Sequence, residues 1–179
     1  AINKMLEYDP TIRELIESKP NEPVDRSFIG TMGHVMAISA ATKDPTRVGG
    51  LLESAHAVLA GLDPANEIAF GMAMGKLWGV HLNDQNGMKY DQDKAFGVEN
   101  LRQAFNQIKV LMENDYGNGG EYIGLDVKAM RTQKDDVCYR HIENSLKIAK
   151  MLEKKVLKFD YGFQKACVAK RDYEALEMY

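Results

Sequence analysis

The stretch from Leu77 to Gly97 combines a histidine with two aspartates, and these residue types can hold a cation. Residues 77–80 are a short apolar run that predicts a buried strand. His81 follows the run, and Asp91 and Asp93 flank a glutamine ten residues further on. Side chains alternate in extended chain, so both aspartates point the same way. Hard divalent cations take carboxylate oxygens and many also take imidazole, although an Asp-x-Asp pair is also common in polar surface loops.

The rest of the chain alternates short strand-like segments with helical ones, which predicts βαβ units and a parallel sheet. Strands are expected at residues 12–17, 47–53, 77–82 and 121–128. Helices are expected at residues 1–9, 30–42, 56–62, 65–74, 97–114, 134–158 and 163–179.

Every expected strand brings an acidic residue or a histidine to its carboxyl end. Ligands of parallel sheets bind at that end of the strands. One such residue would mean little, but all of the expected strands share the feature, which favours a metal site over a polar surface loop. The residues are Glu17, Glu53 with His56, His81 with Asp91 and Asp93, and Asp126.

Composition and charge exclude several classes of partner. The chain has 179 residues, enough for one domain with a hydrophobic core. Its net charge of −3 provides no basic surface for nucleic acid, and no apolar run is long enough to cross a membrane. Its 2 cysteines are too few for a disulfide framework, which favours a reducing, cytoplasmic location.

Several motifs with specific residue order are spread over residues 12–132. They are Glu17-Ser18-Lys19-Pro20-Asn21-Glu22-Pro23, Thr31-Met32-Gly33-His34, Glu53-x-x-His56, the stretch 82–97 with Lys89-Tyr90-Asp91-Gln92-Asp93, and Asp126-Val127-Lys128 with Arg131-Thr132. In their order and spacing the chain resembles the carboxyl-terminal half of the xylose isomerase family of (β/α)8 barrels.

The resemblance implies an α/β fold that is half of a TIM barrel, with the strands here as strands five to eight. Residues 1–158 would form this half-barrel, and residues 159–179 a helical arm or tail. Half a barrel leaves open edges and an uncovered core. We therefore expect the missing N-terminal half to come from another chain or from a longer protein, and we expect a homo-oligomer, as in this family.

The resemblance also implies a centre of two divalent cations bridged by Glu53. The first cation would be held by Glu17, Glu53, His81 and Asp126. The second would be held by Glu53, His56, Asp91 and Asp93. Together with His56, the catalytic residues would be Lys19, which would hydrogen-bond the C1 oxygen of a sugar, and Asp93, which would move a hydroxyl proton. The implied reaction interconverts an aldose and a ketose by a metal-assisted 1,2-hydride shift.

His81 departs from the family pattern, which has an aspartate at this place. A histidine there is similar to the rhamnose isomerases and ketose 3-epimerases, and it suits Mn or Co better than Mg. An epimerase or dehydratase acting on a sugar or polyol therefore stays open as an alternative. A DNA-repair endonuclease built on such a barrel would need a basic groove, which the net charge of −3 argues against. A half-barrel that binds metal without turnover is a further alternative.

Overall fold

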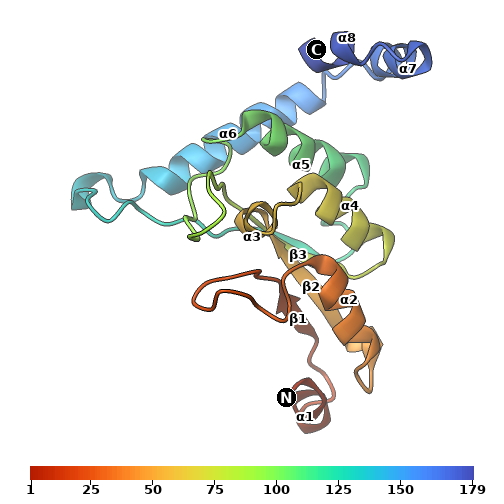
Figure 1. Cartoon of the computed structure of the whole chain (residues 1–179), viewed down its shortest axis with the longest axis vertical. Helices are drawn as coiled ribbons and strands as arrows, with labels where there is room; N and C mark the ends of the chain where they lie inside the picture. Colours follow the sequence, from red (N-terminus) through yellow and green to blue (C-terminus); the bar gives the residue numbers. More distant parts are fainter.

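A parallel sheet of four strands forms the centre of the chain, whose residues 1–179 are all described by a computed structural model (Figure 1). The strands are β1 (Glu14–Glu17), β2 (Val48–Glu53), β3 (Leu77–Leu82) and β4 (Tyr122–Leu125). They lie side by side in sequence order, and each adjacent pair is parallel. A doubly wound sheet would reverse its order at a switch point, whereas a barrel adds its strands in sequence. The order therefore confirms the predicted α/β, barrel-like arrangement.

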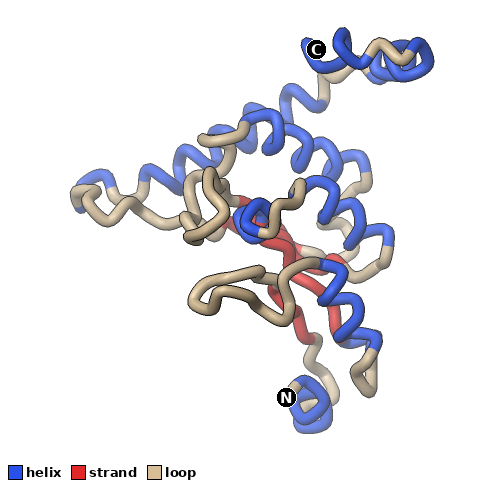
Figure 2. The backbone as a smooth tube through the Cα atoms, viewed as in Figure 1, coloured by secondary structure: helices blue, strands red, loops and turns tan.

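Helices follow the strands close to the positions expected from the sequence (Figure 2). They are α1 (Ile2–Tyr8), α2 (Met32–Ala40), α3 (Ser54–Leu59), α4 (Pro64–Ala73), α5 (Leu101–Glu113), α6 (Arg140–Val156), α7 (Tyr161–Lys170) and α8 (Tyr173–Met178), with 3-10 turns η1 (Pro45–Arg47) and η2 (Asp135–Val137).

The C-terminal segment differs from the single helix expected over residues 163–179. Arg171 adopts a left-handed conformation with φ 57°, which ends α7. Asp172 then caps a new helix, because its side chain accepts a hydrogen bond from the backbone N–H of Ala175. These two adjacent residues divide the segment into α7 and α8.

One hydrophobic core joins the sheet to its helices. It includes Leu52 of β2 and Val80 and Leu82 of β3, and it extends to Ile108 of α5 and Leu152 of α6. Because these strand residues share a core with the helices, the helices cover one face of the sheet. This is the helical outer layer that a barrel places around its strands.

The opposite face of the sheet carries side chains that no helix covers. Tyr122 is 45% exposed, and its ring lies so close to Gly79 that a Cβ there would overlap it. Trp78, which directly precedes Gly79 in β3, covers Gly49, and the Arg13 guanidinium carbon lies 3.7 Å from the Trp78 ring centroid. Trp78 therefore lies at the amino end of the strand, away from the predicted site.

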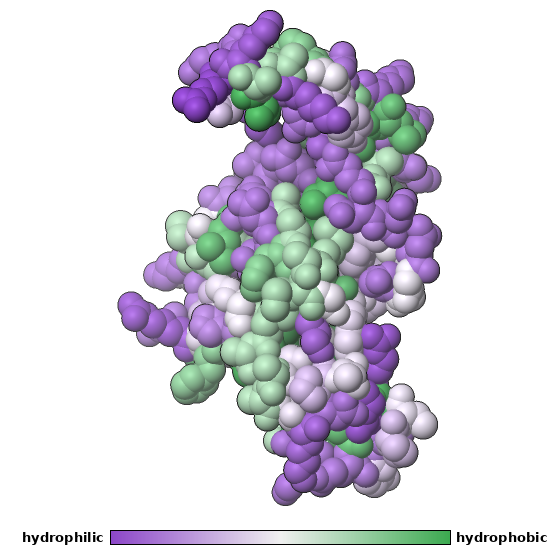
Figure 3. All heavy atoms as spheres, turned by 90° about the vertical axis from the view of Figure 1, so that its right-hand side faces the viewer, coloured by the Kyte–Doolittle hydropathy of each residue, from purple (hydrophilic) through white to green (hydrophobic).

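Large hydrophobic residues are also exposed elsewhere on the molecule, and Figure 3 shows a band of them along one face. Exposed apolar surface of this kind marks places where a protein contacts other structure. None of the helices combines the length and hydropathy that crossing a bilayer demands.

Candidate metal centre

Four residues from four adjacent strands meet at the carboxyl edge of the sheet. Glu17 and Glu53 are the last residues of β1 and β2, His81 pairs with Glu53 across β2 and β3, and Asp126 directly follows β4. The potential ligand atoms of these residues lie within 4.8 Å of one another. We call Glu17, Glu53, His81 and Asp126 the first ligand group.

A second ligand group consists of Glu53, His56 and Asp91, whose ligand atoms also lie within 4.8 Å of one another. His56 lies in the first turn of α3, three residues after Glu53, and this spacing brings both side chains to one side. Asp91 arrives on the loop between β3 and α5, which an isolated bridge between Asp84 and Lys94 folds back on itself. Glu53 thus belongs to both groups.

The two oxygens of Glu53 face different groups. Oε1 lies 3.3 Å from His56 Nε2, whereas Oε2 lies 3.8 Å from His81 Nδ1. A carboxylate that presents one oxygen to each of two sites is arranged to bridge a pair of cations. This geometry agrees with the bridging role that the family resemblance implies for Glu53.

Lys19 and Asp93 adjoin the second group without belonging to it. Lys19 Nζ lies 2.6 Å from Asp91 Oδ2. Asp93 pairs with the Lys128 ammonium, and its Oδ1 accepts a hydrogen bond of 3.3 Å from Asn83. Asp93 therefore lies next to the predicted second site, and its role as a ligand stays a prediction.

Buried nitrogen and oxygen atoms that could bind a metal but have no hydrogen-bond partner indicate whether cations fit the two ligand groups. His56 Nδ1, His81 Nδ1 and Asp91 Oδ1 are buried, and none of them has such a partner. Most buried polar atoms in proteins do have one. His81 Nδ1 lies 3.7 Å from Asp126 Oδ2, too far for a hydrogen bond. Carboxylates combined with imidazole suit Mn or Co, so the residues fit divalent cations of this class.

Comparison with known proteins gives the chain a family context. No family model matches it. It is 35% identical to the xylose isomerase of Thermus thermophilus over 124 residues, which are 69% of this chain and 31% of that protein. It is 36% identical to the xylose isomerase of Streptomyces lividans over 132 residues, 74% of this chain and 32% of that protein. The chain is xylose isomerase-like. It spans about a third of the length of these curated relatives.

A solved structure shows the same fold at lower sequence identity. The xylose isomerase-like chain superposes on a D-tagatose 3-epimerase-like protein with a TM-score of 0.64 and 20% identity. The match covers 87% of this chain and 53% of the other. The likeness confirms the fold class, and its partial cover of the neighbour agrees with a partial barrel.

Several buried carboxyl groups lie close together in the candidate metal centre, and their pKa values shift. Burial raises the pKa of Glu53 to about 10, with a further contribution from the adjacent Glu17. Burial would also raise the pKa of Asp91, but hydrogen bonds from His56 and Lys19 lower it below its ordinary value. The pKa of Asp93 is raised by burial and by the Asp91 carboxylate, against the opposing effect of Lys128. Cations would relieve this crowding of carboxylates.

The raised pKa of Glu53 predicts that cation binding releases a proton. At pH 7 the metal-free carboxyl is protonated, because its pKa is about 10, and a bound cation displaces the proton. Between the ordinary value of 4.5 and about 10 the folded state holds more protons than the unfolded state, so this group's contribution to metal-free stability is lost as pH rises. Titration calorimetry with Mn²⁺ in buffers of different ionisation enthalpy measures the release, and equal heats in all buffers would contradict it.

Asn83 is the residue of the centre whose role sequence reasoning did not assign. Its Nδ2 donates hydrogen bonds to Glu53 Oε1 at 2.8 Å and to the backbone oxygen of Asp126 at 2.9 Å, besides the longer bond to Asp93. The one feature of the sequence that could have indicated this role is an amide side chain two residues after His81, at the carboxyl edge of the sheet. Sequence pattern does not distinguish such an amide from a turn residue.

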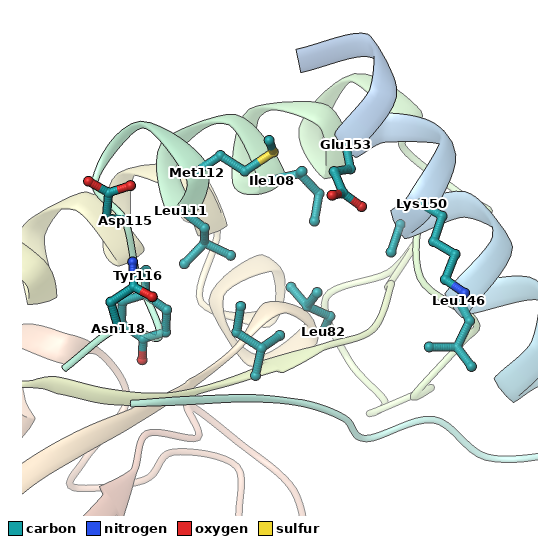
Figure 4. Close-up of a pocket in the computed structure, with 12 residues that line it drawn as sticks. Leu82, Ile108, Leu111, Met112, Asp115, Tyr116, Asn118, Leu146, Lys150 and Glu153 are labelled. Atoms are coloured by element: carbon teal, nitrogen blue, oxygen red, sulfur yellow. The ribbon is translucent and has the colours of Figure 1, made fainter. Parts of the chain in front are cut away.

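A pocket of about 450 Å³ lies elsewhere, between the sheet and the helices (Figure 4). Leu82 of β3 lines it from below, Ile108 and Leu111 come from α5, and Leu146 and Lys150 come from α6. None of the residues of the two ligand groups lines this pocket. Most of its lining residues are hydrophobic, and the pocket is separate from the cation centre.

Proposed function

We propose that the chain carries the metal centre of a divalent-metal-dependent sugar isomerase that interconverts an aldose and a ketose. The strongest support is that two ligand groups share Glu53. Each group also has a buried potential ligand atom that makes no hydrogen bond. The identity of about a third to curated xylose isomerases gives the centre its chemical context. The proposed cofactor is a pair of divalent cations, Mn or Co in preference to Mg.

Side chains of this chain would bind and orient the open-chain sugar. Bound cations would polarise the sugar carbonyl and stabilise the developing alkoxide. Lys19, whose side chain is 34% exposed, can donate a hydrogen bond to the C1 oxygen. In the reaction a hydrogen moves from C2 to C1 with its bonding electrons, the C2 hydroxyl loses its proton and the C1 oxygen gains one. We propose that Asp93 accepts the hydroxyl proton, and its position beside the second ligand group supports this role.

The remainder of the barrel is part of this proposal. Strands β1 and β4 end the sheet on either side, and the face bearing Tyr122 is not covered by helices. Unpaired strand edges and bare apolar side chains need a partner. We propose that an N-terminal half-barrel closes residues 1–158 into a full barrel, and that residues 159–179 form an arm contacting another subunit of a homo-oligomer.

A second candidate function is a ketose 3-epimerase, because the structural likeness is to a D-tagatose 3-epimerase-like protein and because His81 lies in the first group. An epimerase removes a carbon-bound proton and returns one from solvent. A hydride shift keeps the original hydrogen. The complete protein should therefore give ketose with little solvent deuterium when it turns over an aldose in D₂O. Extensive incorporation at carbon in that ketose, read by NMR or mass spectrometry, would contradict the hydride shift. Conversion of a ketose to its C3 epimer with solvent deuterium at C3 would instead select the epimerase.

A further inference from the structure

The Asn83 amide has an orientation that its surroundings determine. The residue is 1% exposed, so it is buried away from water. Its Oδ1 accepts a hydrogen bond of 2.7 Å from the backbone N–H of Ala55, which only an acceptor can do. The NH₂ group must therefore face the carboxylates, as its bonds to Glu53 and to the Asp126 backbone also require.

The Asn83 amide makes hydrogen bonds that position residues of both ligand groups. It donates to Glu53, the shared ligand, and to the backbone carbonyl of Asp126, a ligand of the first group. Through Ala55 it holds the amino-terminal turn of α3, where the next residue is His56 of the second group. Three strand ends and one helix start are thus tied together at a buried side chain.

We propose that Asn83 is a positioning residue that makes Glu53 bridge the two cation sites, an inference that rests on the proposed two-cation centre. Asn83 donates to Oε1 of Glu53, the oxygen that faces His56, and leaves Oε2 toward His81. A carboxylate without this bond can rotate and chelate a single cation with both oxygens. The hydrogen bond therefore selects bridging over chelation, and it links occupancy of one site to the other.

The test compares Mn²⁺ binding to the complete protein that contains this chain and to two variants of it by calorimetry and electron paramagnetic resonance. Asn83→Asp keeps an acceptor for Ala55 but loses both donors, and Asn83→Ala loses both functions. A bridged Mn²⁺ pair gives a spin-coupled spectrum, which we expect in the wild type and not in either variant. Partners that orient ligands typically contribute about 10- to 100-fold to metal affinity, and we expect a loss of that size at the second site.

The sign of the change in Asn83→Asp separates positioning from charge. An added carboxylate alone would tighten cation binding, so weaker binding is explained by lost positioning. Gln107→Ala is the matched control, because Gln107 is buried and bonds Ser54 at 2.6 Å without contacting a ligand side chain. It should lower the melting temperature and keep the coupled spectrum.

Each remaining outcome identifies which proposal is wrong. A coupled spectrum and unchanged affinities in Asn83→Asp would overturn the role of Asn83 and leave the two-cation centre intact. The same result in Asn83→Ala would do so even if Asn83→Asp failed to fold. A wild type without a coupled pair would instead overturn the proposed centre, and this inference with it.

Discussion

Replacing Glu53 with glutamine is expected to abolish binding of both cations, because Glu53 is the only residue common to the two ligand groups. Glutamine keeps the size of the side chain and can still accept the hydrogen bond from Asn83. It cannot supply a charged oxygen to each group. Since even partners outside the ligand set contribute about 10- to 100-fold to affinity, loss of a shared ligand should exceed about 100-fold at both sites. Titration calorimetry with Mn²⁺ and metal analysis of the dialysed protein measure the effect.

Glu17→Gln is the matched control for this variant. Glu17 belongs to the first group alone, so its replacement should weaken one cation and leave the second in place. Glu17 is also exposed, at 40% of its side chain, so the change should perturb folding little. If Glu53→Gln still binds two cations, or loses no more than Glu17→Gln does, Glu53 does not bridge.

Removing the cations should lower thermal stability strongly. A ligand bound only by the folded state adds about 2.7 kcal/mol when its free concentration is 100 times its Kd, so two sites together add roughly 5 kcal/mol. For a chain of this size about 1 kcal/mol shifts the melting temperature by about 2–4 °C, which predicts a fall of roughly 10–20 °C on chelation. The folded centre buries several carboxyl groups close together, and bound cations would compensate their charge, which is the structural reason for the dependence.

Differential scanning calorimetry with Mn²⁺ and with a chelator measures this shift. The Glu53→Gln variant serves as the control, since a protein without cations has none to lose and its melting temperature should not respond to the chelator. A wild-type melting temperature that is the same under both conditions would show that the two ligand groups hold no cation in solution.

The sequence by itself determined most of the elements and the residue types that gather at the candidate centre. β3 has the predicted bounds, Leu77–Leu82, because a short apolar run before a turn is a local signal. The residues of both ligand groups are among those predicted. Glu17, Glu53, His81 and Asp126 lie at or next to strand ends, which parallel strands bring to one edge, whereas His56 and Asp91 were predicted from their spacing and the family resemblance. The sequence pattern did not predict the break in the C-terminal segment, where Arg171 divides one expected helix into two.

Only the tertiary structure decided which of these side chains pair with one another and which way their oxygen atoms face. It pairs Asp93 with Lys128 beside the second group, although Asp91 and Asp93 are alike in sequence. It also directs the two oxygens of Glu53 toward different histidines and places Asn83 between the strands. These outcomes depend on strand register and on a loop that folds back through the Asp84–Lys94 bridge. Distances of this kind join residues far apart in the chain, so no local periodicity encodes them.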